Sequence, residues 1–186
     1  MNLNEQISES INALRSGGVI LCPSDTIASL SCDAARPDAI ERIFEIKARP
    51  SEKRMIILVS SVTMLEGYVQ DIPDSAYQLI DLSDDPLTIV YPSAKMLPEI
   101  CRAEDGSVGI RVAKDGFIKT LIERFRKPII STSANISGQD APLKVSDVVS
   151  EVKKQVDLVV DLEEYREKPS SIVKFNSDGS FKIIRK

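Results

Sequence analysis

Residues 107–138 read SVGIRVAKDGFIKTLIERFRKPIISTSANISG, and the fold class follows from the pattern of this segment. Its first segment, 107–112, is short, apolar and rich in β-branched residues, which predicts a strand. Residues 117–125 then place apolar side chains at helical spacing. Pro128 ends this helix and leads into a second apolar strand, IIST, at 129–132. A strand, a helix and a strand in this order are typical of α/β proteins.

The same reading extends outward over the whole chain. Apolar periodicity predicts further helices at 2–16, 37–47, 62–69, 74–82 and 145–154, and further strands at 19–22, 26–32, 55–59, 87–92, 158–160, 171–175 and 181–185. The segments 93–106 and 136–144 are predicted loops. Asn176-Ser177-Asp178-Gly179 between the last two strands is a hairpin signal, so these two strands are antiparallel. We therefore expect one α/β (α+β) domain over residues 1–186, with a mixed parallel/antiparallel sheet flanked by helices.

Composition limits the chemistry. The chain of 186 residues has no histidine, which excludes Ser-His and Cys-His nucleophile pairs and histidine-ligated metals. Its net charge of −4 gives no overall attraction to nucleic acid. The three cysteines show no CxxC spacing and are expected to be reduced thiols. Without a signal peptide or an apolar run of membrane length, we expect a soluble, cytoplasmic protein that does not contact membranes.

Basic residues gather in IKARPSEKR (46–54), where a predicted helix ends. Pro50 disfavours helical backbone at Arg49, so Lys47 and Arg49 are expected to point the same way in extended chain. An ammonium beside a guanidinium suits phosphate oxygens. The simpler interpretation is a solvated basic turn.

Two strand ends carry hydroxyl groups. Ser131, Ser133 and Asn135 alternate after an apolar strand, an arrangement that can hold a phosphate or a carboxylate or can simply close a turn. CPSDTIASLSCDA (22–34) forms either a turn or a polar pocket wall. Arg111, in the middle of a predicted strand, either extends to an edge of the sheet or binds an anion.

Together these segments resemble the YrdC family, whose TsaC-type members are threonylcarbamoyl-AMP synthases. The family motifs occur in order, spread over most of the chain, and the length resembles the short single-domain form. The matching segments are Pro23 to Ala34, Ile46 to Pro50, Val108 to Arg111, Ser133 to Gly138 and Pro169 to Ile172. The resemblance implies a twisted mixed sheet around a concave, basic cavity.

It also implies the reaction and its partners. The enzyme would be a nucleotidyltransferase that joins L-threonine, bicarbonate or CO₂ and ATP into threonylcarbamoyl-AMP and pyrophosphate, for threonylcarbamoyladenosine at position 37 of tRNA. Mg²⁺ would arrive with ATP, without a permanent cofactor or a protein metal site. tRNA or double-stranded RNA and downstream tRNA-modification proteins would be further partners. By motif position, ATP would be bound by Lys47, Arg49, Lys53, Ser107, Ser133, Asn135 and Arg185, and threonine by Thr26, Arg111, Ser131 and Ser170.

The chain departs from the family pattern at four positions. Ala28 and Ser29 stand where the family has an aromatic residue and glycine, Ser31 replaces the next glycine, and Leu58 occupies a place where many relatives have histidine. Two alternatives therefore stay open besides a minor structural role. One is a paralogue with an altered amino-acid substrate. The other is a non-catalytic double-stranded-RNA-binding module, in which Lys47, Arg49, Lys53, Arg54, Arg111, Lys114, Arg124 and Arg126 converge on one face.

Overall fold

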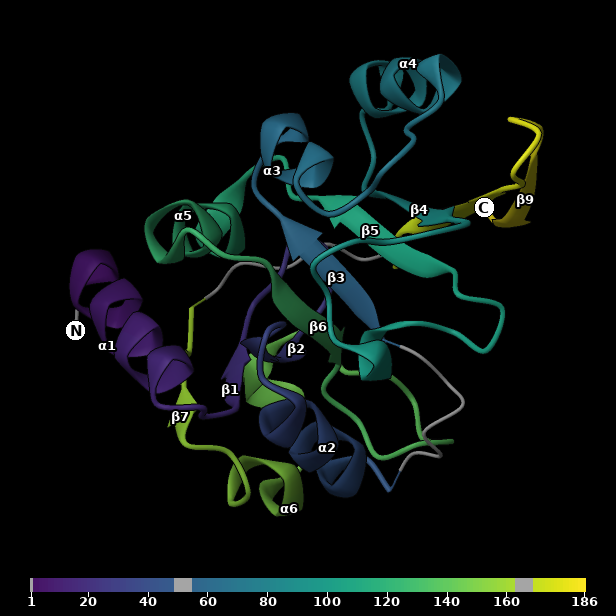
Figure 1. Cartoon of the computed structure of the whole chain (residues 1–186). Helices are drawn as coiled ribbons and strands as arrows, with labels where there is room; N and C mark the ends of the chain where they lie inside the picture. Colours follow the sequence, from purple (N-terminus) through teal and green to yellow (C-terminus); the bar gives the residue numbers. More distant parts are fainter. Residues whose placement is uncertain (1, 49–54, 163–168) are drawn as a thin grey trace.

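A mixed sheet runs through the centre of the molecule (Figure 1). The computed structural model describes residues 2–48, 55–162 and 169–186. Within these ranges nine strands form one sheet in the order β7-β1-β2-β6-β3-β5-β4-β8-β9. They are β1 (Ile20–Cys22), β2 (Ser29–Asp33), β3 (Ile56–Val59), β4 (Leu87–Tyr91), β5 (Val108–Val112), β6 (Ile129–Ser133), β7 (Leu158–Val159), β8 (Ser171–Phe175) and β9 (Phe181–Arg185). β1–β7, β3–β5 and β4–β8 pair in parallel and the other neighbours antiparallel, which confirms the predicted mixed sheet.

The helices follow the apolar stripes of the sequence. The described residues contain α1 (Leu3–Arg15), α2 (Pro37–Ile46), α3 (Val62–Glu66), α4 (Asp74–Leu82), α5 (Gly116–Phe125) and α6 (Ser150–Lys153), with 3₁₀ turns at Glu99–Cys101 and Val145–Asp147. A capping box between Asn2 and Glu5 begins α1, and Gly17, with a φ of 80°, follows its end. None of the helices described is long and apolar enough to cross a bilayer.

One predicted helix, 145–154, is wrong as a single element. The chain instead forms the 3₁₀ turn Val145–Asp147 and the short α6, separated by Val148 and Val149 in extended conformation. Val148 is buried in the core. We attribute the break to these two β-branched residues, which favour extended backbone and let Val148 reach the core.

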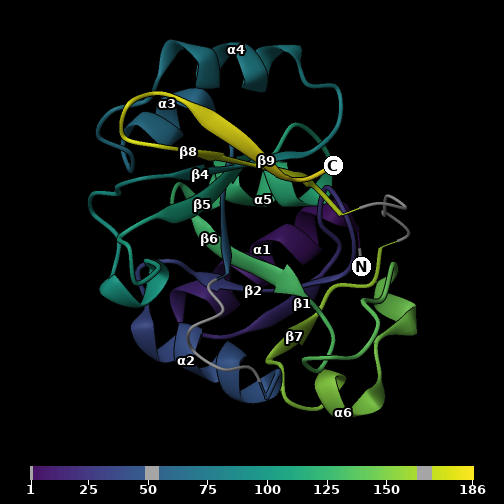
Figure 2. The ribbon, with the colours of Figure 1, turned by 90° about the vertical axis from the view of Figure 1, so that its right-hand side faces the viewer.

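Alternation along the strands builds an apolar cluster on each face of the sheet. Leu21, Leu30 and Ile57 belong to the first cluster, together with residues of α2, α3 and α4. Ile20 and Leu58 belong to the second, with residues of α1 and α5. Figure 2 shows the sheet at right angles to the first view, with α3 and α4 at one end and α1 and α5 behind it. Both faces are therefore covered over part of their area.

The second face changes character along β6. Ile129 at its start is fully buried with α5 in the second cluster. Ser131 and Ser133 point to the same side of the sheet, since residues two apart share a face. These two serines line a cavity. The start of β6 thus packs under α5, and its polar end lines the cavity.

Candidate functional site

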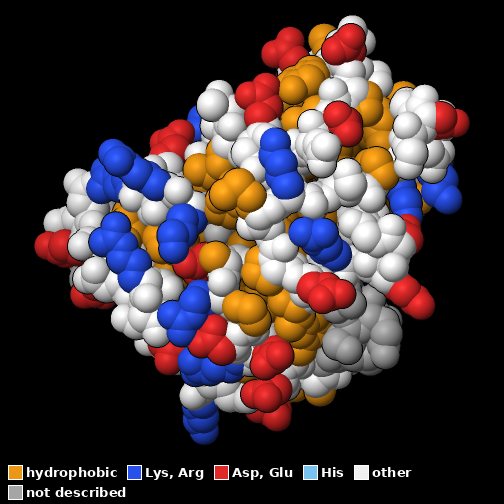
Figure 3. Space-filling model, in the orientation of Figure 1, with side chains coloured by type: hydrophobic (Ala, Val, Ile, Leu, Met, Phe, Trp, Pro, Cys, Tyr) orange, Lys and Arg blue, Asp and Glu red, His pale blue; other side chains and the backbone are white. Residues whose placement is uncertain are grey.

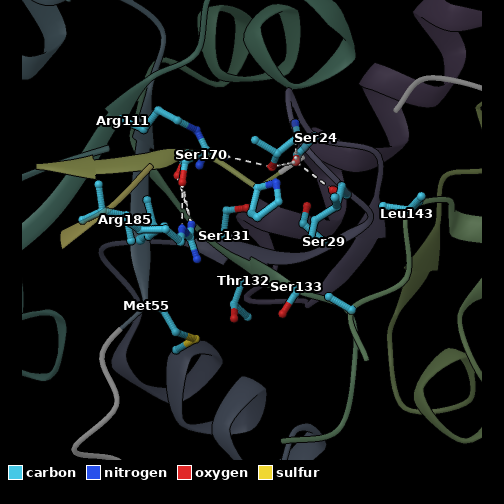
Figure 4. Close-up of a pocket in the computed structure, with 16 residues that line it drawn as sticks. Ser24, Ser29, Met55, Arg111, Ser131, Thr132, Ser133, Leu143, Ser170 and Arg185 are labelled. Atoms are coloured by element: carbon cyan, nitrogen blue, oxygen red, sulfur yellow. Dashed lines mark hydrogen bonds between the residues drawn. The ribbon is translucent and has the colours of Figure 1, made fainter. Parts of the chain in front are cut away.

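A cavity of about 420 Å³ opens on this face of the sheet (Figure 4). That volume is within the range of small-molecule sites. Its polar lining residues are Ser24, Thr26, Ser29, Arg111, Ser131, Thr132, Ser133, Ser170 and Arg185, and its apolar ones are Ile27, Met55, Ile56, Ala141, Leu143, Pro169 and Ile172. Six of the predicted site residues therefore meet here: Thr26, Arg111, Ser131, Ser133, Ser170 and Arg185.

The neighbouring strands β2 and β6 form the floor of the cavity, and this floor carries hydroxyl groups. β2 and β6 pair so that Ser29 lies opposite Ser133 and Ser31 opposite Ser131. The Ser29 and Ser31 hydroxyl oxygens are 3.4 Å apart, and the Cys22 sulfur lies 3.8 Å from each. Burial raises the pKa of Cys22 to about 11, and the two serine contacts only partly oppose this effect. Cys22 is thus a neutral thiol under the floor.

Arg111 is buried in mid-strand and pairs with Asp25. Its Nε and NH2 donate to the two carboxylate oxygens of Asp25 at 3.0 and 2.7 Å. Both side chains are at most 4% exposed, so the charges are compensated out of contact with water. The remaining contacts of the guanidinium are long: NH1 lies 3.5 Å from Thr88 Oγ1 and NH2 3.4 Å from Thr26 Oγ1. Arg111 therefore does bind an anion, and that anion is a carboxylate of the chain itself.

The contacts of the Ser24 and Thr26 hydroxyls determine which of the two donates its proton to the other. The Ser24 hydroxyl donates its one proton to the Ile27 carbonyl at 2.7 Å. In its 2.9 Å contact with Thr26 Oγ1 it must accept, so Thr26 is the donor. Thr26 consequently offers lone pairs, not a proton, to any other neighbour. This geometry suits the N–H group of a ligand better than a carboxylate.

Arg185 is the second guanidinium of the cavity. Its Nε and NH2 donate to the Ser170 carbonyl at 2.9 and 2.7 Å (Figure 4). The Ser170 hydroxyl bonds in turn to Thr88 Oγ1 at 2.8 Å. Partial burial and, secondarily, repulsion from Arg111 lower the pKa of Arg185. Among the described residues no carboxylate forms a salt bridge with it, so its charge remains open to an anionic ligand.

Lys47 and Asn135 lie beside the cavity and not among its lining residues. The Lys47 ammonium, 1% exposed, donates to the Ser133 carbonyl and, at 2.7 and 3.3 Å, to the carbonyl and side-chain oxygens of Asn135. The Ser137 amide donates back to the Lys47 carbonyl at 2.8 Å. The Ser133 hydroxyl donates to Asn135 Oδ1 at 2.5 Å. Lys47 thus connects the end of α2 to the end of β6 and to the loop that follows it.

The other predicted residues lie elsewhere. Ser107 precedes β5 and donates to Asp105 Oδ1 at 2.5 Å, outside the lining set. Bonds from Lys174 and Ser107 hold the pKa of Asp105 well below its usual range. Arg49 and Lys53 fall outside the described residues, so their role in ATP binding stays a prediction.

Several cavity residues are absent from the predicted ATP and threonine sets, although Ser24 and Ser29 lie in segment 22–34, for which the sequence predicts either a turn or a polar pocket wall. Ser24 and Ser29 flank the predicted Thr26, and Ser29 alternates with Ser31 as Ser131 does with Ser133, a signal that marks a second polar strand. Asp25 shows no signal for its pairing, because it is 86 residues away from Arg111. Met55 is an ordinary apolar residue in the sequence, and only the sheet order brings it here, whereas Ile172 ends the matched segment Pro169 to Ile172.

Comparison with known families agrees with this architecture. Residues 12–186 match the model of the Sua5/YciO/YrdC family, which carries the description "Telomere recombination". The chain belongs to this family. The resemblance inferred from the motifs is therefore confirmed.

Relatives and solved structures extend this result. The chain is 34% identical over 164 residues to the threonylcarbamoyl-AMP synthase of Pseudoalteromonas translucida, covering 87% of this chain and 88% of that one. The same identity and length apply to a Vibrio cholerae synthase, with 87% of each chain covered. The structure of Pyrococcus abyssi Sua5 complexed with L-threonine matches with a TM-score of 0.87 and 28% identity, over 94% of this chain and 52% of that chain. E. coli YciO, 22% identical, matches in fold over 100% of this chain and 90% of its own, with a TM-score of 0.86.

The positions that depart from the family pattern have distinct surroundings. Ala28 is buried, and its backbone accepts from the Ala134 amide and donates to the Leu143 carbonyl, each at 3.0 Å. Ser29 lines the cavity and Ser31 is buried beneath it. Leu58 is fully buried in the second apolar cluster. Of these four residues, only Ser29 is in a position to touch a ligand.

Proposed function

We propose that the protein is an L-threonylcarbamoyladenylate synthase, which forms threonylcarbamoyl-AMP and pyrophosphate from L-threonine, bicarbonate or CO₂ and ATP. The observation that carries this proposal is a cavity in which hydroxyls of two paired strands face two guanidinium groups, in a chain 34% identical to synthases of this name. The product would serve tRNA modification, with tRNA and later modification proteins acting downstream.

The chemistry needs positioning and charge compensation more than proton transfer by histidine. A carbamate oxygen of N-carboxythreonine attacks the α-phosphorus of ATP, a new P–O bond forms, and the bond to the leaving pyrophosphate breaks. Because both reactants are anionic, cations and hydrogen-bond donors lower the barrier by holding them together. Arg185 offers such a charge, whereas the charge of Arg111 is already compensated by Asp25.

The roles of the ATP residues follow from their surroundings. We assign Arg185 to the phosphates of the nucleotide, with Arg49, Lys53 and Ser107 as further contacts carried over by motif. The Ser133 hydroxyl has given its proton to Asn135 Oδ1, so we assign its lone pairs to an O–H or N–H group of the nucleotide. Lys47 and Asn135 act on the same site by holding the end of β6, where Ser133 lies, since their polar groups bond to each other and to Ser133.

Threonine would lie between Thr26, Arg111, Ser131 and Ser170. The Asp25 carboxylate occupies the Nε–NH2 edge of Arg111, so a substrate carboxylate would meet the NH1 edge next to Thr88. The lone pairs of Thr26 would accept from the substrate N–H group. Mg²⁺ would enter with ATP as part of the substrate.

The test is threonine-dependent release of pyrophosphate from Mg-ATP in bicarbonate buffer. We expect turnover with wild type and a loss of about 10- to 100-fold in kcat/KM for Thr26→Val, which replaces the hydroxyl by a methyl group. The surface variant Thr120→Val serves as a matched control and keeps full activity. Wild-type protein that releases no pyrophosphate with any amino acid would refute the proposal.

A changed amino-acid substrate is the second candidate, and Ser29 favours it. Its side chain projects into the cavity where the family pattern has glycine, which narrows the floor and adds a hydroxyl. The same assay run with each amino acid in turn distinguishes the two. Turnover with another amino acid and none with threonine would establish this candidate.

Double-stranded RNA binding has less support. Two of the eight basic residues that it would need, Lys47 and Arg111, are 1% and 4% exposed. On the face seen in Figure 3, Lys and Arg gather over the region of α5, and acidic side chains lie among those lower down. RNA binding therefore stays an alternative without a specific observation in its favour.

A further inference from the structure

Strand β9 lies at the edge of the sheet and carries Arg185 at its end (Figures 1 and 2). It pairs antiparallel with β8, with Phe181 opposite Phe175, Lys182 opposite Lys174, and Ile183 opposite Val173. The next pair is Ile172 with Arg185, so the register shifts by one residue. Ile184 is the extra residue, and this irregularity is a β-bulge.

The bulge decides which face Arg185 occupies. In a regular ladder side chains alternate, so Ile184 would lie opposite Ile172, and Arg185 would lie opposite Ser171 on the other face. Val173 and Phe175 point to that other face, where they are buried in the first apolar cluster. Ile172 points into the cavity. One extra residue therefore moves the guanidinium from the apolar side of the sheet to the cavity side.

We propose that the β-bulge at Ile184 is a positioning device that turns Arg185 into the cavity, where it binds the anionic part of the substrate. Ile184 acts as a spacer through its backbone, because its side chain is 52% exposed and lies outside the cavity lining. The carbonyl of Ser170 then fixes the guanidinium through two hydrogen bonds. Only the identity of the anion, the triphosphate of ATP, rests on the proposed function.

The charge balance supports a binding role for the group so placed. Arg111, the other guanidinium of the cavity, is neutralised by Asp25. Arg185 donates two hydrogen bonds to one carbonyl, that of Ser170, and has no carboxylate partner among the residues that the structure describes. Turning it away would leave the described cavity lining without an uncompensated cation.

The experiment changes the number of residues that precede the guanidinium in β9, because each residue removed moves the side chains that follow to the other face of the sheet. The first variant deletes Ile184, which removes the bulge but keeps Arg185 opposite Ile172 in a regular ladder. The second deletes Ile183 and Ile184 and carries Lys186→Ala, so that Arg185 lies opposite Val173 and faces away. The third has the same double deletion with Lys186→Arg, which returns a guanidinium to the place opposite Ile172. Arg185→Ala and Ile184→Ala are the reference variants.

The readout is binding of inorganic tripolyphosphate by calorimetry, with pyrophosphate release from ATP measured separately. We expect Arg185→Ala and the second variant to weaken binding about 10- to 100-fold, the loss of one charge-assisted contact. Deletion of Ile184, Ile184→Ala and the third variant should bind within about 3-fold of wild type. Circular dichroism and thermal unfolding check that each variant is folded, and recovery in the third variant is itself a test of folding.

Three results would overturn the inference. They are weak binding after deletion of Ile184 alone, wild-type binding by the second variant, or no recovery in a folded third variant. A different result is that the variants bind tripolyphosphate only when a guanidinium faces the cavity, while the wild-type protein releases no pyrophosphate. That result would support the inference and refute the proposed function. The two outcomes are therefore distinguishable.

Discussion

Arg111 and Asp25 form a buried ion pair between a strand and the loop that follows β1. The two side chains are 4% and 3% exposed and make a two-bond contact. A buried charge that loses its partner is far less stable than the intact pair. The pair therefore links the cavity wall to β5, and this link can be measured.

Arg111→Met should lower the free energy of unfolding by about 3–5 kcal/mol, because it leaves the Asp25 carboxylate buried without a cation. Adding Asp25→Asn to Arg111→Met should recover part of this loss, since the uncompensated charge is gone. Urea unfolding of the three proteins measures both effects. Equal stability of the single and double variants would show that the two side chains are not coupled.

The three cysteines should be unreactive in the folded protein. All are buried, and burial raises the pKa of Cys22 to about 11. The thiolate is the reactive form, and its fraction falls about tenfold for each pH unit below the pKa. We expect iodoacetamide to modify Cys22 slowly at pH 8 and faster as the pH approaches 11. Peptide mass spectrometry, with urea-unfolded protein as control, measures the rate. Equal rates in folded and unfolded protein at pH 8 would contradict this expectation.

At the scale of the element, α5 ends on a residue that does not favour its conformation. Arg126 follows Phe125 with a φ of 61°, in the left-handed region where glycine usually ends helices. Its side chain is exposed. The helix ends here because Pro128 disfavours helical backbone at Lys127. Arg126 adopts the left-handed conformation in spite of its steric cost.

Arg126→Gly should raise the free energy of unfolding by about 0.5–1 kcal/mol, since glycine adopts positive φ without the clash of a Cβ. Arg124→Gly, in the last turn of the same helix, should lower it by about 1 kcal/mol and is the matched control. Chemical unfolding compares the two. Destabilisation of similar size by both substitutions would show that the strain at Arg126 is absent.

The local pattern of apolar residues predicts most helices and strands. It does not predict which strands pair in the sheet. Apolar spacing predicts α1, α2 and α5 and most of the strands, because each of these buries one face. All five residues of β9 are exposed, and the hairpin signal before this strand marks it instead. The helix predicted at 145–154 is wrong because Val148 reaches the core from extended chain. Nor does alternation in FKIIR predict the direction of Arg185, since an unbroken alternation gives the opposite face from the bulged register. The sequence identifies the cavity residues Ser131, Arg111 and Ser170, whereas the place of Met55 and the pairing of Asp25 with Arg111 depend on long-range sheet order.

At the scale of the whole molecule, the cavity lies across the sheet. Ser29 and Ser131 come from β2 and β6, whereas Arg111 and Arg185 come from β5 and from β9 at the sheet edge. The sequence separates these groups widely, so a ligand that contacts both sets adds a further link across the sheet, beyond those made by β3 and by the Arg111–Asp25 ion pair. Such a ligand binds the folded chain and not the unfolded one.

Mg-ATP should therefore raise the melting temperature. At 100 times the dissociation constant the stabilisation is about 2.7 kcal/mol, which corresponds to about 5–11 °C for a chain of this length. Arg185→Ala should lose most of this increase, because the guanidinium contacts the ligand from the edge strand. Lys182→Ala removes a charge from the same strand outside the cavity lining and should keep the increase, which separates contact from general electrostatics. Scanning fluorimetry over a range of ATP concentrations measures all three proteins. An equal increase in wild type and Arg185→Ala would mean that the nucleotide binds without reaching β9, and the ligand would then be confined to the β2–β6 side of the cavity.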